Sequence, residues 1–231
     1  MKIRIIAAAL MVTVSPLCLA SGPWIEMRDS WETAHDKNEI AIRGGYDFES
    51  MAGVMLTNAY YQNRGTHKLE HGWNEIEAWA PLVQFSPKWY MFGGAVLSET
   101  TDGTGESLYA DVRFIESKDF SVTARYRYVF RNYDTLDLDS QNNRDDFHWI
   151  AMFWNYRINE NWFYSFEPDL FIRANNYHAG NGKRHNYEMN NNFSYTGFKH
   201  WQPYFELSWI DRSVEKHEED YRVRVGLRYN F

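Results

Sequence analysis

The chain has 231 residues, of which 44% are hydrophobic, 18% aromatic and 24% charged, and its formal net charge is −7. With a mean hydropathy of −0.60 and no run of about 20 apolar residues after position 20, the sequence excludes a membrane-spanning helix there. The acidic balance argues against nucleic-acid binding, and the length is consistent with a single domain.

The first twenty residues have the pattern of a secretory signal peptide. Lys2 and Arg4 form a positive start, an apolar stretch covers 5–14, and Cys18-Leu19-Ala20 resembles a small-x-small cleavage site. We expect cleavage after Ala20, with an uncleaved anchor as the alternative. Residues 21–231 then form one domain without cysteine, which must be held together by something other than disulfides.

The rest of the chain is made of short segments in which apolar and polar residues alternate. Twelve of them begin near Trp24, Glu39, Gly53, Trp73, Trp89, Ser107, Phe120, Phe147, Trp162, His185, Trp201 and Tyr221. The last segment is the clearest: one face carries Tyr221, Val223, Val225, Leu227, Tyr229 and Phe231, and the other carries Arg222, Arg224, Gly226, Arg228 and Asn230. One face suits lipid and the other suits water, which is typical of transmembrane β-strands.

The links between the segments alternate in length. We expect short links such as 157–161 to be periplasmic turns, and the longer polar links 132–146, 175–184 and 213–220 to be extracellular loops. The sequence therefore predicts an all-β fold, a transmembrane up-and-down antiparallel β-barrel of about twelve strands in the bacterial outer membrane. The terminal Phe231, after an aromatic strand, resembles the signal that the barrel-assembly machinery recognises.

Aromatic residues near the segment ends predict girdles at the two membrane interfaces. We assign most of the tryptophans to these girdles: Trp24, Trp73, Trp79, Trp89, Trp162, Trp201 and Trp209. For Trp73 and Tyr109, a position facing the lumen, where they would stack on sugar rings, is the alternative.

Several segments resemble the oligogalacturonate-specific porin family, which also includes sialic-acid porins. The resemblance covers essentially the whole mature chain and is carried by 54–58, 71–79, 164–168, 203–207 and 209–212. It implies a monomeric twelve-stranded barrel with a narrow pore, lined by basic residues, that passes short acidic sugars.

Alternation independently assigns a set of arginines to the lumen. We expect these to line the pore and bind substrate: Arg28, Arg43, Arg113, Arg125, Arg127, Arg131, Arg157, Arg173, Arg212, Arg222, Arg224 and Arg228. Guanidinium groups bind carboxylates with two hydrogen bonds and stay charged at any relevant pH. Barrel closure would place the arginines of the last strand and first two strands opposite those of strands six to nine.

Inward acids predict two further features of the wall. Glu75 and Glu77 on one side, and Glu188 and Glu206 on the other, would separate the two arginine groups into basic tracks. The alternative is that the arginines pair with acids and only fill the barrel, for which Glu26, Glu39, Asp111 and Glu167 are available.

The resulting hypothesis is an anion-selective outer-membrane porin for short acidic oligosaccharides, with oligogalacturonides as the first choice. Facilitated diffusion would need no cofactor, no metal and no covalent step, so we do not expect an enzyme. His67 and His71 have the spacing of a helical metal site, but we expect them in a loop. The rival hypotheses are an outer-membrane barrel hydrolase and a non-conducting structural or adhesive barrel.

Overall fold

The computed structural model describes residues 21–34, 37–212, 214 and 218–231; the predicted signal peptide, residues 1–20, lies outside them. The described residues form fourteen β-strands. These are β1 (Gly22–Glu32), β2 (Lys37–Asp47), β3 (Gly53–Asn63), β4 (Leu69–Ser86), β5 (Trp89–Thr100), β6 (Thr104–Ser117), β7 (Phe120–Arg131), β8 (Asp134–Leu136), β9 (Asn142–Arg144), β10 (Phe147–Arg157), β11 (Trp162–Arg173), β12 (His185–Tyr195), β13 (Trp201–Ile210) and β14 (Asp220–Asn230). No helix among the described residues is long and apolar enough to cross a membrane.

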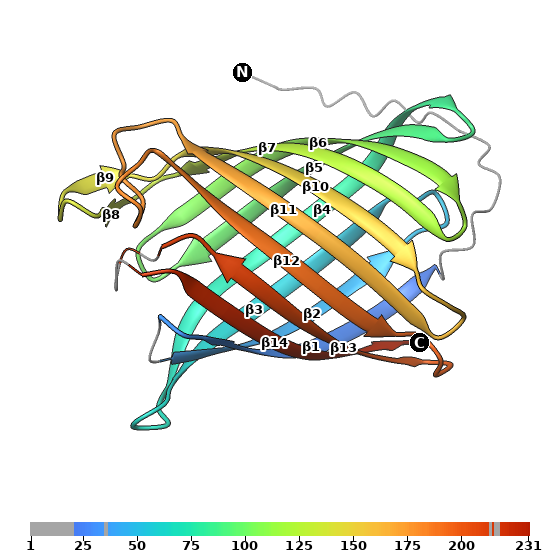
Figure 1. Cartoon of the computed structure of the whole chain (residues 1–231), viewed down its shortest axis with the longest axis horizontal. Helices are drawn as coiled ribbons and strands as arrows, with labels where there is room; N and C mark the ends of the chain where they lie inside the picture. The colour runs from blue at the N-terminus through green and yellow to red at the C-terminus, as the bar shows by residue number, and fades with distance from the viewer. Residues whose placement is uncertain (1–20, 35–36, 213, 215–217) are drawn as a thin grey trace, which may run out of the picture.

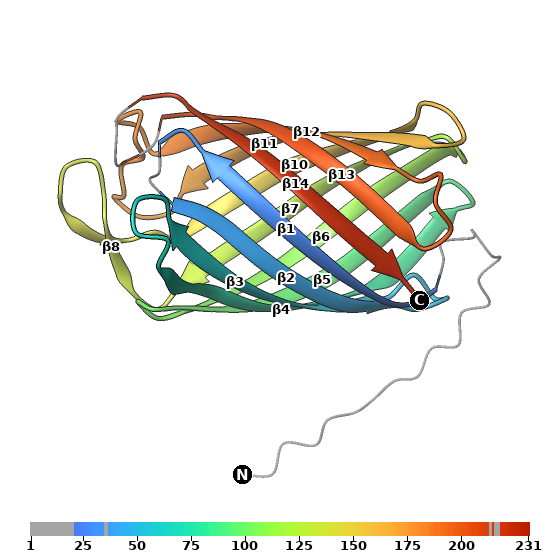
Figure 2. The same cartoon turned by 90° about the horizontal axis from the view of Figure 1, so that it is seen from below.

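Twelve of the strands close into an antiparallel barrel, because β14 pairs with β1 as well as with β13. The barrel strands follow the chain order around the ring, apart from β8 and β9, which pair only with each other (Figures 1 and 2). The twelve predicted segments are the twelve barrel strands. Their tilt across the barrel axis is plain in Figure 1 and is what closure of a sheet into a barrel requires.

The two ends of the barrel differ. The C-terminus lies at the end with short turns, and the β8–β9 hairpin projects from the other end (Figure 2). The hairpin lies within the predicted loop 132–146, where the sequence had indicated only a polar link. We call these the turn end and the loop end.

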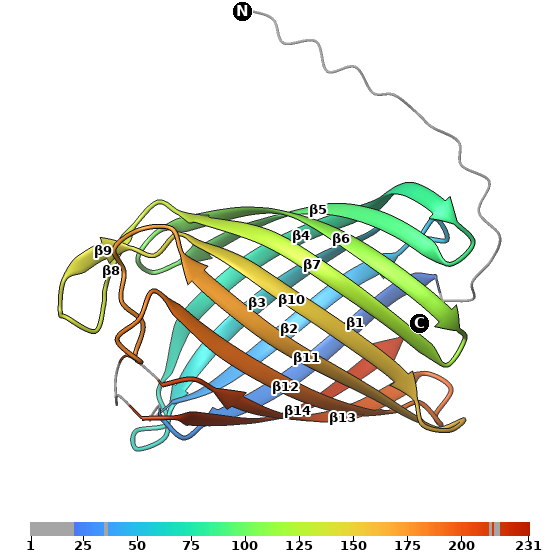
Figure 3. The ribbon, with the colours of Figure 1, turned by 45° about the horizontal axis from the view of Figure 1, so that its top comes forward.

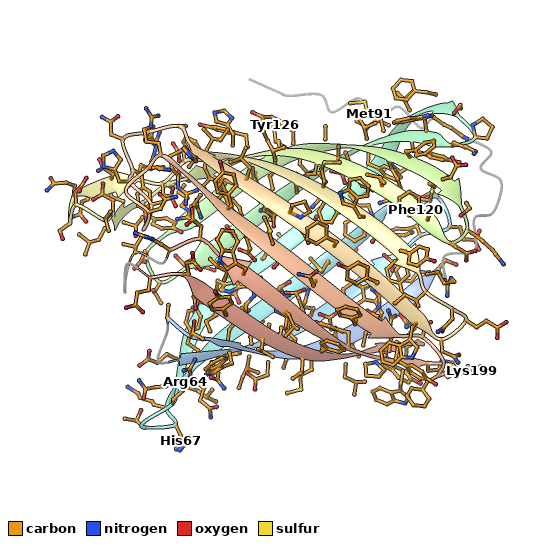
Figure 4. The ribbon with its side chains drawn as sticks, in the orientation of Figure 1. Arg64, His67, Met91, Phe120, Tyr126 and Lys199 are labelled. Atoms are coloured by element: carbon orange, nitrogen blue, oxygen red, sulfur yellow. The ribbon has the colours of Figure 1, made fainter. Side chains whose placement is uncertain are left out.

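The two faces of each strand have the expected polarity. On β14, Tyr221, Val223 and Val225 are 40–54% exposed on the outer surface, while the arginines between them turn inward. Figure 4 shows Met91 and Tyr126 on the outer surface as well. An apolar outside and a polar inside are the reverse of a soluble fold and suit a protein surrounded by lipid.

Inward glycines make room for inward aromatic rings on the neighbouring strand. Four directly paired positions show this: Gly45 with Trp24, Gly53 with Trp79, Gly94 with Tyr109 and Gly226 with Tyr204. A Cβ at any of these glycines would lie 2.1–2.5 Å from a ring atom. The ring occupies the space beside the glycine that a side chain would otherwise take, which fills the lumen wall and helps to fix the register of the pair.

Four sequence-based assignments are wrong in detail. Trp24 and Trp79 turn into the barrel over their glycines, and Trp73 faces the lumen as its alternative had it, so these three are not girdle residues. Strand alternation, not position near a strand end, decides the face. His71 lies in β4, which begins at Leu69, so it is not in a loop. Trp89, Trp162 and Trp201 are exposed on the outside, as predicted.

Candidate functional site: the barrel lumen

Among the described residues, three cavities follow one another along the lumen. A central cavity of about 500 Å³ adjoins a cavity of about 570 Å³ toward the turn end, since Glu26, Arg43 and Glu77 line both. A third cavity of about 640 Å³ lies at the loop end. Its lining shares no residue with that of the central cavity, so a layer of side chains separates them.

The predicted arginines divide among these regions. Six line the central cavity: Arg28, Arg43, Arg125, Arg127, Arg224 and Arg228. Arg113 lines the turn-end cavity, and Arg173 and Arg212 line the loop-end cavity. Arg212 is exposed beyond the end of β13, and Arg157 is 40% exposed at the end of β10, where it faces Asp119 at 3.7 Å. These two therefore differ from the inward strand positions that alternation predicted.

Arg131 and Arg222 belong to the layer between the central and loop-end cavities. Arg222 contacts Glu32, which lines the loop-end cavity, and Glu206, which lines the central one, at 3.7 and 3.5 Å. It also pairs with Glu188. Arg131 donates to Asp145 at 2.9 Å. Two clusters of ion pairs thus lie just below the loops, one around Arg222 and one around Asp145.

The arginine groups lie on opposite walls of the barrel. Six steps around the ring separate β1 from β7 in either direction, so Arg28 faces the wall that carries Arg125 and Arg127. Figure 3 looks onto β10 and β11, with β1 and β2 behind them. β4, which carries Glu75 and Glu77, lies between the two groups on one side, and β12 and β13 on the other.

Each central-cavity arginine has a carboxylate within 4 Å. The pairs are Arg28–Glu39 (3.4 Å), Arg43–Glu26 (3.1 Å), Arg125–Asp111 (2.8 Å), Arg127–Glu75 (3.9 Å), Arg224–Glu206 (2.7 Å) and Arg228–Asp47 (2.9 Å). Three of the four acids considered as wall partners from the sequence, Glu26, Glu39 and Asp111, are in fact paired. Glu167 lines the cavity without such a pair among the described residues.

The ion pairs do not use all the guanidinium donors. A guanidinium carries five N–H donors, and the Nε atoms of Arg28, Arg43 and Arg222 are buried without an acceptor. The hydroxyl of Thr57, paired with Arg43 across β2 and β3, is also without a partner. The wall therefore retains hydrogen-bonding capacity on one side of the central cavity.

The two aromatic candidates for sugar stacking bind carboxylates instead. Trp73 lines the central cavity, and its Nε1 donates to Glu39 at 3.0 Å. Tyr109 donates to Glu77 at 2.6 Å, and the guanidinium of Arg125 lies 4.0 Å from its ring centroid. Since the Tyr109 ring packs over Gly94 on one side and under Arg125 on the other, it braces the wall and offers no free face to a sugar.

Loops 132–146 and 174–184 are joined over the loop end. The amide of Leu138 donates to the carbonyl of His178 at 3.1 Å, and the His178 ring contacts Asp139. Asp145 enters the barrel between Arg131 and Arg173, where burial raises its pKa although both guanidinium groups act against this. Asp137, Asp139 and His178 bring one potential ligand atom each within 4.8 Å, but the carboxylate of Asp137 is already bound by N–H donors.

A closed twelve-stranded antiparallel barrel with a charged lumen and an apolar outer surface defines a bacterial outer-membrane channel protein. The model of the oligogalacturonate-specific porin protein (KdgM) family matches residues 15–231. The chain belongs to this family, whose members are porins and not enzymes.

Similar proteins of known name agree with this assignment. The N-acetylneuraminic acid outer membrane channel protein NanC of Escherichia coli K12 is 20% identical over 98% of this chain and 99% of its own. The oligogalacturonate-specific porin KdgM of Dickeya dadantii is 26% identical over the full length of both chains. Among solved structures, the NanC porin has a TM-score of 0.78 at 17% identity, covering 90% of this chain and all of that one. The KdgM porin in complex with disordered oligogalacturonate has a TM-score of 0.66 at 19% identity, over 90% and 99% of the two chains.

Proposed function

We propose that this porin passes short acidic oligosaccharides across the outer membrane by facilitated diffusion, with oligogalacturonides as the first choice. The observation that carries the proposal is the set of opposed arginines around the central cavity, two of which, Arg28 and Arg43, keep an unused N–H donor. The relatives named for N-acetylneuraminic acid and oligogalacturonate add support, because both ligands are sugar acids.

The pairing of the arginines determines how such a channel would work. Six arginines and five glutamates line the central cavity, so its net charge is small. A sugar carboxylate would exchange places with a wall carboxylate as it moves from one arginine to the next. Because each contact replaces an existing one, the binding is weak and repeated, which conduction requires. We expect only a slight preference for small anions, and no cofactor or covalent step takes part.

Single-channel recording of the purified protein in a planar bilayer tests this proposal. Under a salt gradient we expect a weakly anion-selective reversal potential and transient block by trigalacturonate. The double variant Arg28→Gln/Arg43→Gln should shorten the block, because it removes donors beside the cavity. Arg157→Gln is the control, since it removes an arginine charge that lies outside the three cavities.

The outcomes separate the rival functions. Anion selectivity without block by trigalacturonate would direct attention to other sugar acids such as N-acetylneuraminic acid. Cation selectivity would contradict the arginine tracks. A silent protein would favour a plugged structural barrel or, if it cleaved lipid or peptide, a hydrolase. We also propose that the porin acts as a monomer within the membrane lipids, which native mass spectrometry in detergent would test.

A further inference from the structure

The loop-end cavity is walled by loops rather than by strands alone. Its lining combines the barrel residues Glu32, Arg173 and Asn186 with Leu138 and Tyr177 from the two joined loops. Its volume of about 640 Å³ is in the range of small-ligand sites and large enough for one or two sugar units. It lies at the end where outer-membrane barrels carry their extracellular loops.

Hydrogen bonds between the loops give this cavity a defined shape. Tyr177, only 7% exposed, donates to the carbonyl of Leu136 at 3.4 Å. Asn175 donates to the carbonyl of Arg144 and to Asp146, both at 3.0 Å. The cavity is therefore pre-formed, which lowers the entropy cost of binding.

The acids that line the cavity are all engaged with the protein. Asp137 accepts hydrogen bonds from Asp139, Gln141 and Asn143, and Asp220 accepts from Thr33, Ala34 and Tyr221. Asp211 accepts from the side chain of Asn181, and Glu32 contacts Arg222. Each of these carboxylates therefore already has a donor within the protein.

Three lining residues, in contrast, have polar atoms without a partner among the described residues. The guanidinium of exposed Arg212 makes no ion pair or hydrogen bond with them. Arg173 lies 2.7 Å from Asp145 through its Nε atom, but its Nη1 atom donates to nothing, and the Oδ1 atom of Asn186 accepts nothing. The unmatched atoms thus belong to the free guanidinium of Arg212, to the paired guanidinium of Arg173 and to one neutral acceptor.

We propose that the loop-end cavity is a capture site for a short sugar acid before it enters the lumen. A carboxylate would bind Arg212 and approach Arg173, and a sugar hydroxyl would donate to Oδ1 of Asn186. A ligand with both groups on one ring satisfies the donors and the acceptor together. The inference rests on the proposed function and adds an external binding step on the path to Arg222, which separates this cavity from the central one.

The test compares block by trigalacturonate added at the loop side and at the turn side. Arg212→Gln should lower the association rate from the loop side roughly three- to tenfold, because rim charges act mainly on association, and leave the turn-side rate unchanged. Asn186→Ala should shorten the loop-side dwell. Lys183→Gln is the matched control, since Lys183 is an exposed cation at the same end of the barrel, in the loop between β11 and β12, and does not line the cavity.

Equal effects of Arg212→Gln and Lys183→Gln on the loop-side association rate would overturn the proposal, because general attraction by loop charge would explain them. The proposal would also be overturned if Arg212→Gln did not change this rate. Saturation-transfer NMR of trigalacturonate with the detergent-solubilised porin gives a readout that does not depend on conduction. Binding that is lost in Arg212→Gln would support the capture site even if the channel did not pass this sugar. Binding that is intact in this variant, together with normal block, would leave the transport function standing and remove the capture site.

Discussion

Tyr204 on β13 reaches across β14 to Glu26 on β1, where its hydroxyl donates to the carboxylate Oε1 at 2.9 Å. It crosses β14 at Gly226, where a Cβ would lie 2.2 Å from the Tyr204 ring. The contact therefore ties together the strands at which the barrel closes. It also orients Glu26, the partner of Arg43 in the central cavity.

Gly226→Ala should destabilise the barrel by about 1–3 kcal/mol, because a methyl group would displace the Tyr204 ring and overpack the wall. Gly44→Ala is the control: Gly44 faces outward, and its Cβ would meet only a backbone oxygen at 3.8 Å. Urea unfolding followed by tryptophan fluorescence measures both. Equal stabilities of the two variants would contradict the passage of the Tyr204 ring over Gly226.

Asp111→Ala should lower the free energy of unfolding by about 2 kcal/mol or more. The Arg125 guanidinium donates two hydrogen bonds to Asp111 and is largely shielded from solvent, so the substitution leaves a buried charge without its partner. Asp119→Ala removes the partner of Arg157 from an exposed pair and should cost less than about 1 kcal/mol. The same unfolding experiment compares the two. A larger loss in Asp119→Ala would show that lumen pairing contributes little to the stability of the barrel.

The β8–β9 hairpin should loosen only in strong acid. Burial raises the pKa of Asp137, but hydrogen bonds from the Gln141 amide and the Asn143 side chain outweigh it, so the pKa lies below the usual 3.8. A carboxylate whose pKa is lowered on folding stabilises the folded form at pH values above its usual pKa. This stabilisation is lost as the pH falls through the lowered pKa.

Hydrogen exchange of residues 134–144 at about pH 5 and about pH 2 tests this effect. We expect protection at the higher pH and loss at the lower. Asp137→Asn should reduce protection already at the higher pH, whereas Asp134→Asn, an exposed position in the same hairpin, should not. Unchanged protection in Asp137→Asn would contradict the role of the carboxylate.

Phe231 should matter for assembly more than for the finished channel. It is 71% exposed and packs edge-on against Tyr229 at 4.9 Å, so it adds little to the barrel core. Phe231→Ala should lower the fraction of heat-modifiable barrel in outer membranes while leaving single-channel conductance unchanged. Phe48→Ala, another exposed aromatic residue at the turn end, is the control. Normal assembly of Phe231→Ala would remove the proposed role of the terminal residue as a recognition signal.

The sequence by itself determined the twelve barrel strands and the faces of their side chains. Alternation with a period of two is a local property, so it assigns Arg224 to the inside and Val225 to the outside without knowledge of any other strand. Its errors fall at the strand ends: Arg212 lies just beyond β13, and Arg157 is 40% exposed at the end of β10.

Only the tertiary structure decided which charges meet and what the loops enclose. Whether Arg127 faces Glu75, or Arg222 joins Glu32 to Glu206, depends on strand order, tilt and stagger in the closed ring. The loop-end cavity likewise depends on loops that are distant in sequence, as in the bond from Leu138 to His178. Such contacts leave no periodic trace in the chain, because they arise from closure of the barrel and not from the conformation of any one segment.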